Sequence, residues 1–76
     1  MESITIHTPF IKLDQLLKYA AVAETGGDAK NLISDGCVTV NESICTMRGK
    51  KIVPGDCITV NCENQKITLR VEADDH

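Results

Sequence analysis

Hydrophobic and polar positions alternate at the start of the chain and then change to a helical spacing. Residues 3–7 read SITIH, in which isoleucines alternate with polar residues as in a short strand. After Pro9, leucines and alanines within residues 12–23 recur at the i, i+3, i+4, i+7 and i+8 positions of an amphipathic helix. A Gly-Gly pair interrupts this spacing, and residues 28–36 predict a second helix that stops at Gly36.

After Gly36 the spacing of the apolar residues becomes two, which indicates strands. Asn41 and Glu42 separate the first two of these strands and predict a hairpin. Because Glu42 stands where a tight two-residue turn favours glycine, we expect a longer loop. The sequence VPGD marks a second turn at residues 53–56. The strands expected in this half of the chain cover residues 37–40, 43–46, 57–61 and 66–71. The order of strand, two helices and then strands predicts an α+β fold.

Length and composition narrow the class of protein. The chain has 76 residues, which predicts a single domain over residues 1–76. A hydrophobic fraction of 42% is typical of a globular protein. No apolar run approaches the roughly 18 residues of a membrane span, and residues 1–15 lack the pattern of a secretory signal. These features predict a cytoplasmic protein without membrane contact.

The cysteines raise the question of a metal site or disulfides, but their spacing favours neither. They contain no C-x-x-C pair, and both histidines lie near the chain ends, whereas structural zinc ligands usually come in close pairs. Without a secretory signal, reduced thiols are expected. We therefore predict no metal, and a metal or redox protein stays open as an alternative. The cysteines are Cys37, Cys45, Cys57 and Cys62.

Side chains suited to catalysis are not grouped in the sequence. Asp14, Asp28, Asp35 and Asp56 fall at predicted helix ends or turns, where aspartate has a structural role. The spacing suggests no Ser-His-Asp or Cys-His grouping. We predict a protein that is not an enzyme and that uses no cofactor.

The cations are distributed unevenly, although the formal net charge is −3. Three of the eight cations crowd into residues 48–51, around one glycine and without an acid. Lys12 and Lys30 stand at the starts of the two predicted helices, where the helix dipole disfavours a positive charge. Lys18, by contrast, follows Asp14 by four residues and is expected to pair with it. Unpaired cations at helix starts and in one loop indicate an anionic ligand.

The segment Thr25-Gly26-Gly27 leads into the second helix. Thr25 is suited to cap this helix, with Asp28 three residues later as in a capping box. Glycines at a helix entry let a ligand approach free backbone N–H groups, the usual setting for phosphate. Together with the surrounding cations, this segment predicts contacts with the phosphates of a nucleic acid.

In order, these motifs resemble the S4-type RNA-binding domain. The family pattern is a basic residue with Leu-Asp, a helix, a small-residue turn, Ala-Lys-x-Leu-Ile, Gly-x-Val-x-Val-Asn and Gly-Asp before a strand. The resemblance covers residues 12–60, most of the chain. Two departures are Thr25-Gly26, where many members have Ser-Arg, and Asn41-Glu42, where many have Asn-Gly. The matching residues are Lys12-Leu13-Asp14, Ala29-Lys30, Leu32-Ile33, Gly36, Val38, Val40-Asn41 and Gly55-Asp56.

The resemblance implies the S4-like fold, also called the alpha-L RNA-binding motif, in its stand-alone bacterial form. Two packed helices would lie against a small, mostly antiparallel sheet of about four to five strands. Structured RNA, either ribosomal RNA or tRNA, would lie across the helix pair and the basic loop, with ribosomal or RNA-modification proteins as further partners. The residues expected at this face are Lys12, Thr25, Gly26, Gly27, Lys30, Arg48, Gly49, Lys50 and Lys51.

Three further expectations complete the interpretation. The core of the domain is expected within residues 12–60, and the acidic residues 72–76 are expected to fray. A monomer is the simplest oligomeric state. The alternative function is a protein-interaction adaptor with an acidic surface, associated with the ribosome or with RNA modification.

Overall fold

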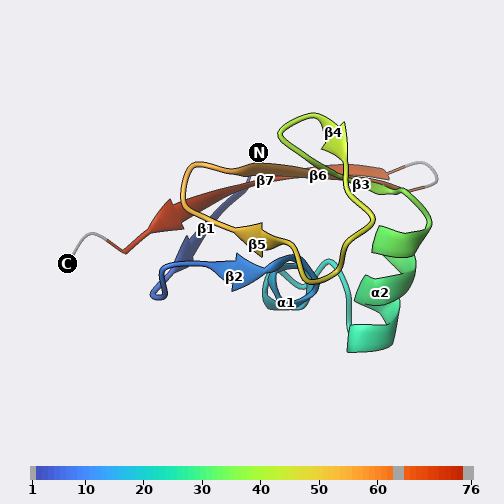
Figure 1. Ribbon diagram of the computed structural model, residues 1–76, viewed down its shortest axis with the longest axis horizontal. Helices are drawn as coiled ribbons and strands as arrows, with labels where there is room; N and C mark the ends of the chain where they lie inside the picture. Colours follow the sequence, from blue (N-terminus) through green and yellow to red (C-terminus); the bar gives the residue numbers. More distant parts are fainter. Residues whose placement is uncertain (1, 63–64, 75–76) are drawn as a thin grey trace.

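The computed structural model describes residues 2–62 and 65–74, and it confirms the α+β fold (Figure 1). Within these residues, no helix is long and apolar enough to cross a membrane. In chain order the elements are β1 (Glu2–Ile6), β2 (Ile11–Lys12), α1 (Leu13–Tyr19), α2 (Gly26–Ser34), β3 (Val38–Val40), β4 (Ser43–Ile44), β5 (Lys51–Ile52), β6 (Cys57–Cys62) and β7 (Gln65–Ala73).

Five strands form the main sheet in the order β1-β7-β6-β3-β4, and β2 and β5 form a separate pair. The neighbours in the main sheet are antiparallel except β1 and β7, which are parallel. This sheet matches the small, mostly antiparallel sheet that the family resemblance implies. The parallel pair joins the two ends of the chain, since β1 is the first element and β7 is the last.

The end of β7 differs from the sequence expectation of a frayed tail. Glu72 and Ala73 pair with Thr5 and Ile6 of β1, and the Asp74 N–H donates to the Ile6 carbonyl at 3.1 Å. The frayed tail is therefore wrong for residues 72–74, because parallel pairing with β1 satisfies their backbone. Residues 75 and 76 lie outside the described residues.

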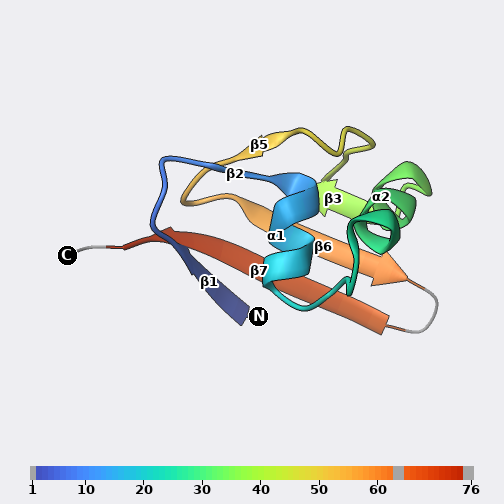
Figure 2. The ribbon, with the colours of Figure 1, turned by 90° about the horizontal axis from the view of Figure 1, so that it is seen from below.

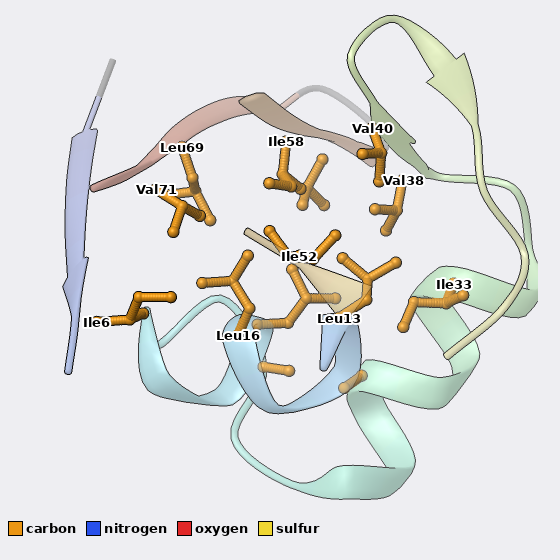
Figure 3. Packing of buried hydrophobic residues seen from close by; sticks show 14 residues of the cluster. Ile6, Leu13, Leu16, Ile33, Val38, Val40, Ile52, Ile58, Leu69 and Val71 are labelled. Carbon is orange, nitrogen blue, oxygen red and sulfur yellow. The ribbon is translucent and has the colours of Figure 1, made fainter. Parts of the chain in front are cut away.

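Both helices cover one face of the main sheet, and the other face carries no helix (Figures 1 and 2). Successive side chains of a strand point to opposite faces of the sheet, and the apolar ones are on the face that the helices cover. The fully buried side chains come from α1, α2, β3, β5, β6 and β7, and they meet between the sheet and the helices (Figure 3). The largest of them are Leu13, Leu16, Leu17, Ile33, Val38, Ile52, Ile58, Leu69 and Val71. This single layer of apolar contacts holds the helix starts and the loops around them in place.

The helix boundaries follow from their caps. α1 ends at Tyr19, four residues before the predicted end, because Ala21 adopts a positive φ of 60°. α2 begins at Gly26, and the Thr25 hydroxyl caps it by accepting the Asp28 N–H at 3.1 Å, as the sequence predicts. It stops before Gly36, whose φ of 76° suits a C-terminal glycine.

The hairpin between β3 and β4 is tighter than the sequence indicates. Val40 pairs with Ser43, which leaves only Asn41 and Glu42 in the turn. Both residues have positive φ, 51° and 72°, as a two-residue hairpin turn requires. The expectation of a longer loop is therefore wrong.

Candidate nucleic-acid interface

The loop that carries the RGKK sequence is attached to the start of α1. The Leu13 N–H donates to the Lys50 carbonyl at 2.9 Å, and the Asp14 N–H donates to the Arg48 carbonyl at 3.1 Å. The next amide, that of Gln15, donates to the Asp14 carboxylate at 2.8 Å. These three amides are occupied, so the start of α1 offers side-chain cations to a ligand rather than free backbone N–H groups.

The pairing of β2 with β5 brings two lysines face to face. Lys12 lies directly opposite Lys51 in the register of this two-stranded sheet. Like charges in such positions destabilise a sheet. The Lys51 ammonium lies 4.9 Å from the centre of the Phe10 ring, where a cation–π contact offsets part of this repulsion. Lys12 and Lys51 are both exposed.

Four exposed cations therefore gather at the start of α1, and none of them forms an ion pair with an acid within residues 2–62 and 65–74. Among the described residues no lysine or arginine forms an ion pair with a carboxylate, and the one contact of this type joins His7 Nδ1 and Asp74 Oδ2, 2.6 Å apart. The expected pair of Asp14 with Lys18 is absent from this part of the chain, and the Asp14 carboxylate accepts the Gln15 amide. We call the four cations the α1 cation cluster, and its members are Lys12, Arg48, Lys50 and Lys51.

The start of α2 forms a second group. The Thr25 hydroxyl and carbonyl accept the N–H groups of Asp28 and Ala29. In the chain as described, the amides of Gly26 and Gly27 donate to no internal acceptor, and a side chain at Gly26 would meet open space. Lys30 is exposed one turn farther along. This helix start therefore offers two free amides beside one cation, with the exposed Asp28 in the same turn.

The structure joins some of the residues that the sequence singles out and leaves others apart. The RGKK loop, including the exposed Gly49, lies beside the start of α1 and runs toward α2 in both views (Figures 1 and 2). Helices α1 and α2 pack against each other. No hydrogen bond links the α2 start to the α1 cation cluster within the described ranges. The two groups are neighbours on one packed helix pair rather than a single bonded site.

A set of side-chain hydrogen bonds between the hairpin turn and the VPGD turn, here called the polar frame, is not visible in the sequence pattern. The Asn41 side-chain amide donates to Asp56 Oδ1 at 3.1 Å, and its carbonyl oxygen accepts the Cys57 N–H at 3.0 Å. The second oxygen of Asp56 accepts the Val53 N–H at 3.0 Å. These bonds fasten the hairpin turn to the VPGD turn. Asn41 and Asp56 both belong to the family pattern, which could have indicated this contact. They are 15 residues apart, so the sequence alone does not show that they meet.

The cysteines offer no metal cluster or activated nucleophile in the described part of the chain. All four are free and half-buried, and no group of three His, Cys, Asp or Glu side chains is placed to hold a metal there. Partial burial raises the pKa of the Cys37 thiol, and the neighbouring Cys62 raises it further. A raised pKa leaves less thiolate, the reactive form of cysteine.

A helix pair under one face of a small sheet, with cations at a helix start, is the arrangement implied by the S4 resemblance. The model of the S4 domain family matches residues 4–69, and the chain belongs to this family. Family membership supports an RNA-binding role.

The chain is also similar to two individual proteins. It is 40% identical over 57 residues to the probable ribosome maturation protein RlbA of Bacillus subtilis (strain 168), a match that covers 75% of this chain and 80% of that protein. Among solved structures, it is similar to the trimeric heat shock protein 15 of Vibrio cholerae, with a TM-score of 0.73 and 25% identity. That match covers 83% of this chain but only 63% of the heat shock protein.

Proposed function

We propose that this protein binds structured RNA, ribosomal RNA or tRNA, by its phosphates and without catalysis. The observation that carries the proposal is the α1 cation cluster, in which Lys12 and Lys51 face each other across a two-residue strand pair. A fold that keeps like charges opposite each other loses stability by doing so. A bound polyanion would reduce this repulsion, and we therefore interpret the lysine pair as part of an anion-binding site.

The α2 start supplies a second set of phosphate contacts in this proposal. The free amides of Gly26 and Gly27 point out of a helix N-terminus, where the dipole favours anions. Lys30 adds a charge one turn along, and Thr25 holds the helix start in shape. Aromatic residues are scarce, at 3% of the chain, so recognition depends on RNA shape and phosphates more than on stacking.

The similarity to a ribosome maturation protein favours ribosomal RNA as the first ligand to test. The matching region includes most of this chain and of that protein, so the two share the domain as a whole. The proposed setting is therefore a ribosomal particle or its precursor in the cytoplasm, with ribosomal proteins as neighbours.

The test is RNA binding at several salt concentrations with a matched pair of variants. One variant replaces Arg48, Lys50 and Lys51 with alanine. The control replaces Lys18, Lys66 and Arg70, which are also exposed and also number one arginine and two lysines. Wild type should bind labelled ribosomal RNA fragments with a log–log salt slope of about −2 to −4.

The two variants distinguish a specific contribution of the RGKK loop from a general effect of net charge. The loop variant should bind weakly, and its slope should shrink in magnitude by roughly 2, since each lost phosphate contact removes about 0.7 to 0.9. The control should keep most of the affinity and the slope. Equal losses in both variants would mean that net charge alone matters, and absence of salt-dependent binding in wild type would point to the protein-adaptor function instead.

A further inference from the structure

A groove of about 420 Å³ separates the β3–β4 hairpin from the loop that follows it. Its volume falls within the roughly 300–1,000 Å³ of ordinary ligand pockets. We call it the hairpin groove. Lys50 of the α1 cation cluster lines it, together with Ile44 and Met47 and several polar residues. The groove therefore borders the proposed phosphate-binding face directly.

Two large apolar side chains line this groove and are left uncovered. Ile44 is 68% exposed and Met47 is 66% exposed, more than any other large hydrophobic residue described. A single exposed apolar side chain needs no explanation, but two on one groove define a surface that water covers poorly. The loop is held in place, since the Met47 carbonyl accepts the Lys50 N–H at 3.1 Å and the Lys50 carbonyl is bonded to α1.

Of the described residues, the charged ones that line the groove are one cation, Lys50, and one acid, Asp56, and the acid disfavours a phosphate beside it. Asp56 lines the groove, and both oxygens of its carboxylate already accept hydrogen bonds from Asn41 and Val53. Its negative charge repels an anion. The hydroxyls of Ser43 and Thr46 also line the groove and, within the ranges described, make no hydrogen bond. The interior thus suits a neutral group with apolar faces and hydrogen-bonding edges.

A nucleotide has both of these parts, a neutral flat base and an anionic phosphate. We propose that the hairpin groove binds one unpaired base of the RNA, while Lys50 and the exposed Arg48 hold its phosphates outside. This inference rests on the proposed function and adds a preference for RNA with a bulged or looped nucleotide. The base must be unpaired, because a paired base in an A-form helix is stacked and its major-groove edge is inaccessible to side chains.

The experiment compares stem-loop RNAs that differ by one nucleotide. One stem is fully paired, and a set of others carries a single bulge at each successive position. Wild type should bind at least one bulged stem about tenfold tighter than the paired stem, a difference of ~1.4 kcal/mol. Ile44→Ser and Met47→Ser should each reduce this preference and leave the salt slope unchanged. Val53→Ser is the control, since Val53 is also an exposed apolar residue, at 45%, and does not line the groove.

Three outcomes would overturn the inference. Equal binding of paired and bulged stems by wild type rules out an unpaired base in the groove. A preference that survives both serine variants places the base elsewhere, and a loss shared by Val53→Ser shows a general effect. In each of these cases salt-dependent binding persists and the proposed function stands, whereas wild type that binds no RNA overturns both.

Discussion

At the scale of single residues, the hairpin turn holds a side chain in a conformation that favours glycine. Glu42 has a φ of 72°, in the left-handed region, and its neighbour Asn41 has a φ of 51°. Asparagine tolerates this region, while a residue such as glutamate pays about 1–2 kcal/mol there. Asn41 is also fixed by its bonds to Asp56 and Cys57. The strain therefore falls on Glu42, which has no such bonds among the described residues.

Replacing Glu42 with glycine should stabilise the protein. Relief of the left-handed strain outweighs the extra freedom that glycine gives the unfolded chain, which is about 0.4–1 kcal/mol. We expect the free energy of unfolding to rise by roughly 0.5–1 kcal/mol in urea or thermal denaturation. Glu24→Gly is the control, because Glu24 is exposed, lies between the helices and has no positive φ. It should lower stability, and equal losses in both variants would contradict the prediction.

The same turn shows that the sequence predicts the presence of the hairpin but not the length of its turn. The hairpin itself follows from the strand patterns around Asn41. Its length does not, because Glu42 argues locally for a longer loop. Pairing of β3 with both β4 and β6 sets the register and forces the two-residue turn. Tertiary pairing overrides the local preference of one residue here.

At the scale of elements, helix ends are decided by caps and burial more than by helix propensity. The alanines after Tyr19 favour a longer α1, yet the Ala21 and Val22 amides donate to the carbonyls of Lys18 and Leu17 and close the helix. The chain then places Ala23 in the core at 5% exposure. The sequence shows the end of α2, where glycine marks it, but not the end of α1, where an alanine takes the same conformation.

Sequence patterns do not predict the two-residue strands β2 and β5. β2 and β5 are too short to show alternation, and the helical spacing of residues 12–23 predicts a helix at residue 12 instead. Their pairing is what places Lys12 opposite Lys51. The sequence therefore identifies the cations of the candidate site but not the geometry that brings them together, since that geometry depends on contacts between distant segments.

Asp56 is expected to stabilise the link between the two turns. Asp56→Ala removes the acceptors for the Asn41 side chain and the Val53 amide, both in the polar frame. Loss of these bonds should lower the free energy of unfolding by about 1–3 kcal/mol, as measured in urea. Asp35→Ala is the control for loss of a carboxylate, since Asp35 is exposed and its side chain makes no hydrogen bond within the described chain. A similar small effect in both variants would show that the frame contributes little.

At the scale of the whole molecule, acids and cations are unevenly placed, although Asp14 and Asp28 lie in the first turns of the two helices near the cations. The molecule is 37 Å long, and the paired ends of β1 and β7 lie away from α2 along this axis (Figure 1). Glu72 and Asp74 lie at that end of β7, whereas the α1 cation cluster borders the helix pair. A net charge of −3 is therefore compatible with a basic face, because steering depends on local potential.

The exposed surface also indicates the oligomeric state of the protein. A stable interface buries about 800 Å² on each partner and has an apolar centre. The outer face of the main sheet presents threonines along β3, β6 and β7 instead, including Thr39, Thr59 and Thr68. Of the exposed large hydrophobic residues only Ile44 and Met47 lie together, on the hairpin groove, while Phe10, Tyr19 and Val53 come from other segments of the described chain.

We therefore expect a monomer, and light scattering after size-exclusion chromatography should give a mass near 8.3 kDa at micromolar concentration. The similar heat shock protein was solved as a trimer, so a mass about three times larger is the informative contrary result. In that case Ile44 and Met47 are the first candidates for the buried contact, as the most exposed apolar pair. If a second copy covers the groove, Ile44→Ser and Met47→Ser should dissociate the trimer, whereas if the groove binds a base they should alter RNA preference and leave the mass unchanged. Measuring mass and RNA binding on the same variants thus separates a groove that binds a base from one that a second copy covers.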